Sequence, residues 1–191
     1  MTLQQKPSNA IRYQGKEYEF YPYYNRVLTL LTEVFPNDLL TDFEKVKITI
    51  TSLSKAPICQ DVFELIILEL FPREKRKPEH DKTMDFEQDA ELIYAGFMQA
   101  YGIDLFAERN KMDWRIFLAL VRGLPEQTEF SRVVKLRCTK IPQRTKANSD
   151  YVDSLVQAKM AVALDEPEED RQKRMAQKWM EIAEGLMNVR R

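Results

Sequence analysis

The sequence contains few of the residues on which metal binding or a disulfide framework depends. It has one histidine, His80, and two cysteines, Cys59 and Cys138, far apart along the chain. A structural zinc site needs four Cys or His ligands in close pairs, and disulfide frameworks belong to small secreted domains that are richer in cysteine. We therefore expect no metal site, and two free thiols that are buried or half-buried.

Motifs typical of enzymes are also missing. The chain has no glycine-rich phosphate loop, no Gly-x-Ser-x-Gly and no His-Glu-x-x-His, and His80 lies in a polar segment rather than beside a nucleophile. Acidic residues alternate between Asp85 and Glu91, but alternate positions on a helix point in diverging directions, unlike a pair of catalytic carboxylates. We therefore expect no catalytic residues, no cofactor and a non-enzymatic role.

Charge and hydropathy give no global indication of a partner. The 29 basic and 30 acidic side chains nearly cancel, so the whole chain is not drawn to nucleic acid or to a membrane surface. The longest apolar run, 62–71, contains two glutamates and is too short to span a bilayer, and the first ten residues lack the pattern of a secretion signal. A cytoplasmic, reducing compartment is expected.

The residues that are present indicate a mainly α protein. Only five glycines and nine prolines occur in 191 residues, which is typical of helices joined by short connections around one core. Aromatic and polar residues alternate around Gln14-Gly15, so a β hairpin is predicted at about 11–21, lying on the helical body or forming an edge for a neighbouring subunit. The predicted helices span 23–35, 41–53, 57–71, 85–101, 114–121, 126–137, 149–164 and 168–189.

Local signals set several of these boundaries. Thr41 and Glu44 form a capping box, and Asp85 and Asp113 are candidate N-caps. Gly102 suits the left-handed turn that ends a helix. Apolar spacing predicts a buried face of Phe43, Val46, Ile50 and Leu53 in the second helix, and the almost wholly apolar third helix is predicted to lie at the centre of the core.

The predicted elements together form a compact multi-helix domain with a short N-terminal β hairpin over residues 1–164. Residues 165–191 are predicted to form a C-terminal helix, either docked on the domain or bound to a partner. In that helix, a coiled-coil-like seam has the a/d spacing of four, three, four and three residues. Its members are Met175, Trp179, Ile182, Leu186 and Val189.

One segment, 131–146, carries charges of one sign only. Its cations suit an acidic protein partner or several phosphates, although the aromatic residues typical of single-strand binding are missing, and a solvated surface explains them equally well. Nucleic acid is the least favoured of these alternatives. The cations are Arg132, Lys135, Arg137, Lys140, Arg144 and Lys146.

Two blocks of the sequence carry a recognisable pattern. The first runs from Phe86 to Leu105, with Phe-x-x-Asp-Ala, Ile-Tyr-Ala and Tyr-Gly-Ile-Asp-Leu. The second runs from Trp114 to Pro142, with Trp-x-x-Phe, Gly-Leu, Thr-x-Phe and Arg-x-x-Lys-Ile-Pro. Together they resemble a family of small proteins from the tail-gene module of long-tailed bacteriophages, whose members are regarded as tail assembly chaperones.

The resemblance implies a role in phage tail morphogenesis in the host cell cytoplasm. It implies binding to the tape-measure protein and to tail-tube subunits, with homo-oligomerisation as a further possibility. The seam and the basic segment are the surfaces that the sequence offers for such partners. The alternatives are a structural tail component that stays in the virion and a nucleic-acid-binding regulator.

Overall fold

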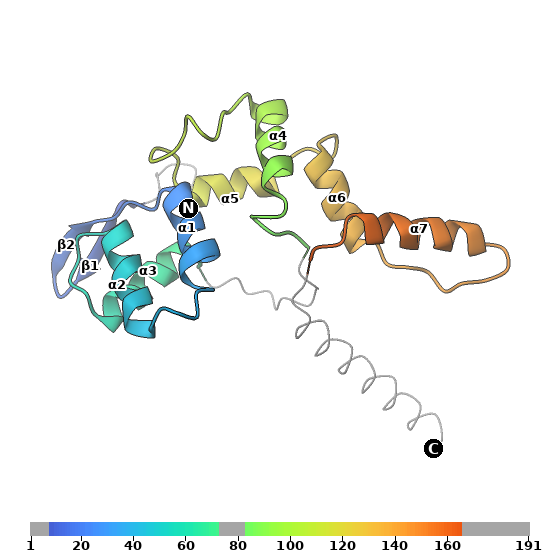
Figure 1. Cartoon of the computed structure of the whole chain (residues 1–191). Coiled ribbons are helices and arrows are strands. Elements are labelled where there is room, and N and C mark those ends of the chain that lie inside the picture. Colours follow the sequence, from blue (N-terminus) through green and yellow to red (C-terminus); the bar gives the residue numbers. More distant parts are fainter. Residues whose placement is uncertain (1–7, 73–82, 166–191) are drawn as a thin grey trace, which may run out of the picture. The chain divides into compact units, whose positions relative to one another are not determined.

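The computed structural model describes residues 8–72 and 83–165, and these are mainly helical with an N-terminal antiparallel hairpin, as predicted (Figure 1). The chain forms two compact units, residues 1–139 and 140–191, each described by itself below. The sequence predicts one domain as far as residue 164. None of the described helices combines the length and the hydrophobicity needed to cross a bilayer.

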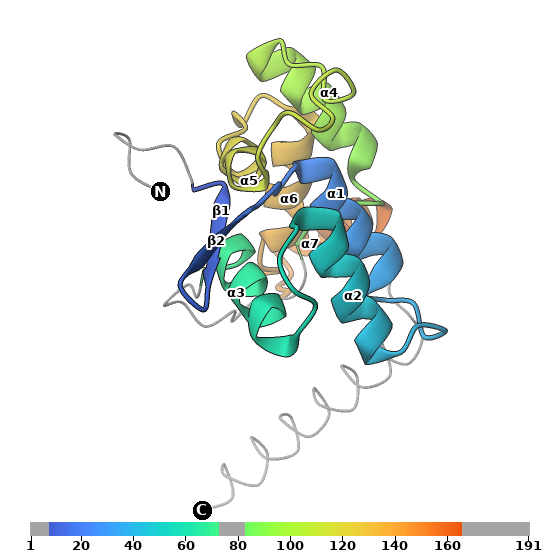
Figure 2. The same cartoon turned by 90° about the vertical axis from the view of Figure 1, so that its left-hand side faces the viewer.

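The hairpin pairs β1 (Ala10–Tyr13) with β2 (Lys16–Glu19), and Ile11 lies opposite Tyr18. Its two-residue turn, Gln14-Gly15, has positive φ at both positions, 50° and 75°, as a turn that matches the twist of the strands requires. Ile11 is buried, and β1 packs against α3 (Gln60–Leu70), as Figure 2 shows. The hairpin therefore lies on the helical body, the first of the two predicted arrangements.

The helix predicted over 23–35 has two parts. Residues Tyr24–Thr29 form α1, and Leu30–Val34 continue it as a π-helical turn, η1. The N–H of Phe35 donates to the carbonyl of Leu30 at 2.9 Å, five residues back, which is the wide spacing of a π turn.

Helix α2 (Asp42–Leu53) begins at the predicted capping box. The N–H of Glu44 donates to the Thr41 hydroxyl at 3.3 Å, and the N–H of Thr41 donates to the Glu44 carboxylate at 2.8 Å. Ile50 and Leu53 are buried, but the prediction for Phe43 is wrong, because its side chain is 66% exposed. Thr49 takes an interior position instead, since its hydroxyl donates to the carbonyl of Lys45 at 2.8 Å.

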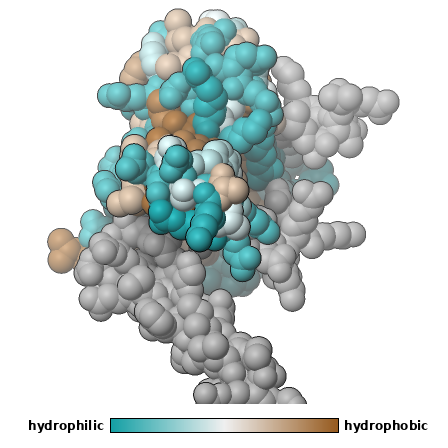
Figure 3. Space-filling view, turned by 90° about the vertical axis from the view of Figure 1, so that its right-hand side faces the viewer, coloured by the Kyte–Doolittle hydropathy of each residue, from teal (hydrophilic) through white to brown (hydrophobic). Residues whose placement is uncertain are grey.

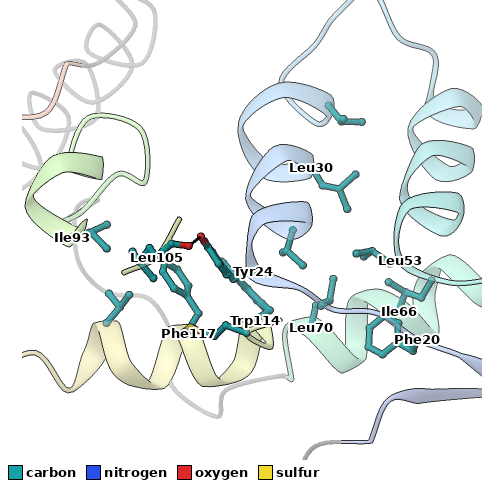
Figure 4. Close-up of a cluster of buried hydrophobic side chains, with 14 of the residues drawn as sticks. Phe20, Tyr24, Leu30, Leu53, Ile66, Leu70, Ile93, Leu105, Trp114 and Phe117 are labelled. Carbon is teal, nitrogen blue, oxygen red and sulfur yellow. Dashed lines mark hydrogen bonds between the residues drawn. The ribbon is translucent and has the colours of Figure 1, made fainter. Parts of the chain in front are cut away.

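Helix α3 is shorter and more one-sided than predicted. It starts at Gln60 rather than near Pro57, and it buries Val62, Ile66 and Leu70 while Leu68 is 47% exposed. Together with Phe20 and Leu53, Ile66 and Leu70 belong to the large apolar core drawn in Figure 4.

The core also holds a cluster of stacked and edge-on aromatic rings around Phe117. The ring centroid of Phe117 lies 4.9 Å from that of Tyr24, 5.5 Å from that of Phe97 and 5.6 Å from that of Trp114. The Tyr24 hydroxyl donates to the carbonyl of Leu105, and Figure 4 shows the two groups meeting beside Phe117. Such ring pairs contribute about 0.5–1.5 kcal/mol each beyond the burial of their area.

A short extended segment after the hairpin joins distant parts of the first unit. The N–H of Tyr21 donates to the carbonyl of Leu53 at 2.7 Å, at the end of α2. Three residues later the N–H of Tyr24 donates to the carbonyl of Met112 at 3.0 Å, and the N–H of Trp114 donates to the carbonyl of Pro22 at 2.7 Å. The N-terminal elements are thereby bonded directly to the start of α5 (Trp114–Arg122).

Helix α4 (Ala90–Tyr101) begins five residues later than predicted. The Asp85 carboxylate accepts the N–H groups of Glu87 and Gln88 at 2.8 and 3.0 Å, so it closes a turn, and Asp89 takes the N-cap position of the helix. The C-terminal prediction is confirmed. Gly102 has φ 65°, and its N–H donates to the carbonyl of Met98 at 3.1 Å.

Gly102 gives a test of backbone conformation alone. A Cβ at this position would meet no atom within 4 Å, so any cost of substitution comes from the positive φ. We expect Gly102→Ala to lower the free energy of unfolding by about 1 kcal/mol and Gly102→Asn by less, because asparagine tolerates the left-handed region. Urea denaturation of both variants checks this, and an alanine variant as stable as the wild type would contradict it.

Helix α5 and the two described helices that follow it match their predictions within a few residues, and the helix predicted over 168–189 lies outside the described residues. The Asp113 carboxylate accepts the N–H of Arg115 at 2.8 Å and caps α5 as expected. Helix α6 (Glu129–Cys138) starts later than predicted because Thr128 is its N-cap, accepting the N–H of Ser131 at 3.3 Å. In the second unit, α7 spans Ser149–Ala161. Of the two thiols, Cys59 is half-buried as expected, whereas Cys138 is exposed, so its predicted burial is wrong.

Candidate functional site

The basic segment is divided between the two units, and most of its cations have carboxylate partners. In the first unit, Arg132 pairs with Glu129 at 2.9 Å and Lys135 with Glu126 at 3.2 Å. All four of these side chains are well exposed, so each pair contributes little to stability.

Arg137, in the same segment, has a very different environment. Its guanidinium donates to both oxygens of Asp89, at 2.7 and 2.8 Å, and to the carbonyl of Thr83 at 3.2 Å. The Asp89 side chain is 1% exposed and that of Arg137 is 12% exposed. The Asp89 carboxylate also accepts the N–H of Asp85 at 2.9 Å, so this bidentate pair ties α6 to the start of α4.

The second unit holds the other three cations. Arg144 pairs with Asp153 of α7 at 2.7 Å, and Lys140 and Lys146 are exposed. Four of the six cations therefore have acidic partners, and all four partners lie outside 131–146. The segment carries only positive charges in the sequence. In the fold, carboxylates from outside the segment lie beside most of these charges, so the segment does not form a purely positive surface.

On the face that Figure 3 shows, the described surface is mostly hydrophilic, with a small area of hydrophobic residues among hydrophilic ones. Among residues 8–72 and 83–165, no group of three or more His, Cys, Asp or Glu side chains is arranged to hold a metal ion.

A half-open groove of about 370 Å³ lies within the first unit. Residues of α1 and η1 line it, together with residues of the 86–87 turn, α4 and the 105–109 loop. We call it the α1–α4 groove. It is lined by Tyr24, Asn25, Leu28, Thr29, Thr32, Glu33, Phe86, Glu87, Ala90, Ile93, Tyr94, Leu105, Phe106, Arg109 and Phe117.

The α1–α4 groove has an apolar interior and polar edges. Ile93, Leu105 and Phe117 are buried in the core, whereas Phe106 is 68% exposed and its ring lies 5.2 Å from that of Tyr94. Burial raises the pKa of Tyr24, and the nearby carboxylates Asp104 and Glu108 raise it further against an opposing effect of Arg109. Tyr24 therefore stays protonated near neutral pH.

A family model described as the bacteriophage Gp15 protein matches residues 4–164. The chain belongs to the bacteriophage Gp15 protein family. The phage origin expected from the resemblance is thereby confirmed. Neither the curated proteins nor the solved structures give a match.

The candidate surfaces differ in whether the Gp15 family match covers them. Every element of the α1–α4 groove lies inside the matched range, as does the whole basic segment. The predicted seam of Met175, Trp179, Ile182, Leu186 and Val189 lies beyond the match and outside the described residues.

The structure also shows what several motif residues do in this Gp15 family protein. Asp89 and Arg137, from the two separate sequence blocks, bind each other. Trp114 and Phe117 stack at 5.6 Å in the core, and Phe86 packs edge-on to Trp114 at the same separation. These motif residues therefore hold the fold together.

Sequence reasoning did not find the groove. The helical spacing of apolar residues in 85–101 predicts one buried stripe of Phe86, Ala90, Ile93, Phe97 and Tyr101, yet Ala90 is exposed and lines the groove. Residues of the 105–109 loop also line the groove, and no periodic pattern in the sequence predicts where a loop packs.

Proposed function

We propose that this protein is a non-enzymatic tail assembly chaperone that binds the tape-measure protein and tail-tube subunits in the host cytoplasm. The family match over residues 4–164 is the main support, because it makes the chain a bacteriophage Gp15 family protein, and the two sequence blocks resemble a family from the phage tail-gene module. A chaperone of this kind needs exposed apolar surface bordered by charge, and the α1–α4 groove has that composition.

The test is co-expression with the long coiled-coil-rich protein that is encoded beside it in the phage genome. We expect that protein to be mostly insoluble alone, and to become soluble and co-purify when this chain is present. The matched control is the same co-expression with a chain of similar size that does not belong to the family. If the partner stays insoluble although this protein is folded, the chaperone proposal fails.

A structural tail component is the second candidate, because membership of a bacteriophage family suits a retained component equally well. Mass spectrometry of purified virions separates the two roles. A component is found in amounts comparable to other tail proteins, whereas a chaperone is missing. A nucleic-acid-binding regulator is less well supported, since four of the six cations of the basic segment are paired with carboxylates.

A further inference from the structure

We propose that the α1–α4 groove binds one amphipathic helix of a partner protein, with the apolar stripe of that helix on the groove floor and Lys or Arg residues flanking the stripe. The identification of this helix with a segment of the tape-measure protein rests on the proposed function. The surface and the chemistry of its ligand are argued from the groove itself.

The floor of the groove suits apolar side chains. Leu28, Phe86 and Ile93 line it together with Phe117, and Ala90 of α4 is a small apolar residue among them. Phe106 also lines the groove, and 68% of its surface is exposed. A large apolar side chain this exposed at the edge of an apolar cavity marks a surface that gains by being covered.

Three polar side chains of the groove are already bonded within the protein. The Tyr24 hydroxyl donates to the carbonyl of Leu105, and the Thr32 hydroxyl donates to the carbonyl of Leu28 at 3.2 Å. The Asn25 amide oxygen accepts the N–H of Asn110 at 2.8 Å. A small polar ligand would need convergent groups with free hydrogen-bonding capacity, so the groove suits apolar side chains better.

The size and shape of the groove favour a helix. Its volume of about 370 Å³ accommodates a few side chains rather than a whole segment, and residues of two helices, α1 and α4, line it. A helix that lies in such a groove inserts residues at i, i+3 or i+4, and i+7, and keeps its other face in solvent.

The charges at the edges favour cations on that helix. Glu33 and Glu87 line the groove, and Arg109 is the only cation among the lining residues. Asp104 and Glu108 do not line it, but they lie close enough to Tyr24 to raise its pKa. Two lining carboxylates against one lining guanidinium, with these two further carboxylates nearby, attract a partner helix that carries Lys or Arg beside its apolar stripe.

Two synthetic peptides of about five helical turns test the chemistry. Both carry the same leucine stripe, one flanked by lysine and the other by glutamate. By fluorescence anisotropy with the full chain, we expect the lysine peptide to bind about tenfold more tightly, and its affinity to fall with added salt. Equal affinity for the two peptides, or no binding of either, would overturn the proposal.

Matched variants locate the binding. The double variant Glu33→Lys/Glu87→Lys reverses two exposed groove charges and is expected to weaken lysine-peptide binding by about tenfold. The control Asp38→Lys/Glu64→Lys makes the same charge change at exposed positions that do not line the groove, and it should bind within about twofold of the wild type. Equal weakening by both double variants would mean that net charge, and not the groove, governs binding.

Two variants that each replace an exposed apolar residue test the apolar contribution to binding separately from the charge. Phe106→Ser removes the exposed groove phenylalanine, and Leu39→Ser removes a side chain that is 92% exposed and does not line the groove. We expect only the first to weaken binding of the lysine peptide, by several-fold. Circular dichroism of each variant confirms that the fold is retained, and an unchanged affinity of a folded Phe106→Ser would contradict the proposal.

Co-expression with the tape-measure protein separates this inference from the proposed function. If the wild type retains the partner and the Glu33→Lys/Glu87→Lys variant loses it, the proposed function and the groove as its binding site are both supported. If that variant retains the partner, and a Trp179→Asp/Ile182→Asp variant in the seam loses it, the function stands and the groove is not its site. If the wild type does not retain the partner, the proposed function fails, and the peptide measurements still decide whether the groove binds basic amphipathic helices.

Discussion

Replacing Ile66 with aspartate is expected to abolish the folded first unit. Ile66 lies in the middle of α3 with none of its surface exposed, next to the other buried residues of that helix. Burying a carboxylate there without a partner costs several kcal/mol, which is comparable to the whole stability of about 5–15 kcal/mol of a domain. Far-UV circular dichroism and thermal melting should show loss of helix and of a cooperative transition.

The control lies two residues further along the same helix. Leu68 is 47% exposed, so Leu68→Asp makes the same chemical change on the outer face and should leave a folded, cooperatively melting protein. A smaller change at the buried site, Ile66→Val, is expected to cost about 0.5–1.5 kcal/mol. If Ile66→Asp melts cooperatively near the wild-type temperature, the placement of α3 in the core is incorrect.

Replacing Arg137 with alanine is expected to lower the free energy of unfolding by about 3–5 kcal/mol, since it leaves the buried Asp89 carboxylate without its cation. Urea denaturation measures the loss. On the same helix, Arg132→Ala removes a cation from an exposed pair with Glu129 and should change stability by no more than about 0.5 kcal/mol.

The double variant Asp89→Leu/Arg137→Met separates the charge from the packing. Because removing both members of a buried ion pair leaves no unpaired charge, this variant should be more stable than Arg137→Ala. A folded Arg137→Ala protein that is as stable as the wild type would show that the pair does not hold α4 to α6. If the stable Arg137→Ala protein no longer bound the partner protein, Arg137 would again be a candidate binding residue.

Elements with a complete local signal were predictable from the sequence. The Gln14-Gly15 turn, the Thr41–Glu44 capping box and the Asp113 cap each need only a few neighbouring residues, and each is observed. Gly102 belongs to the same class, because the positive φ that it adopts is a property of one residue.

The start of α4 was not predictable in the same way. Asp85 and Asp89 are both reasonable N-caps by local rules, and the choice depends on Arg137, 48 positions later, which binds Asp89. The exposure of Phe43 also depends on tertiary packing, since residues 41–44 at the start of α2 are all exposed whereas Ile50 and Leu53 further along the helix are buried. The candidate site was harder still, because a groove is made by the packing of a loop against two helices.

The hydrogen bonds that join the N-terminal elements to the start of α5 determine when the first unit can fold during synthesis on the ribosome. Tyr24 bonds to Met112, Pro22 bonds to Trp114, and the Arg115 guanidinium donates to the carbonyl of Ser8 across 107 positions of sequence. A nascent chain that has emerged only as far as α4 lacks these partners and exposes Tyr24 and its neighbours. The first unit can therefore complete its fold only after α5 has been synthesised, and until then the newborn chain exposes apolar surface that favours aggregation.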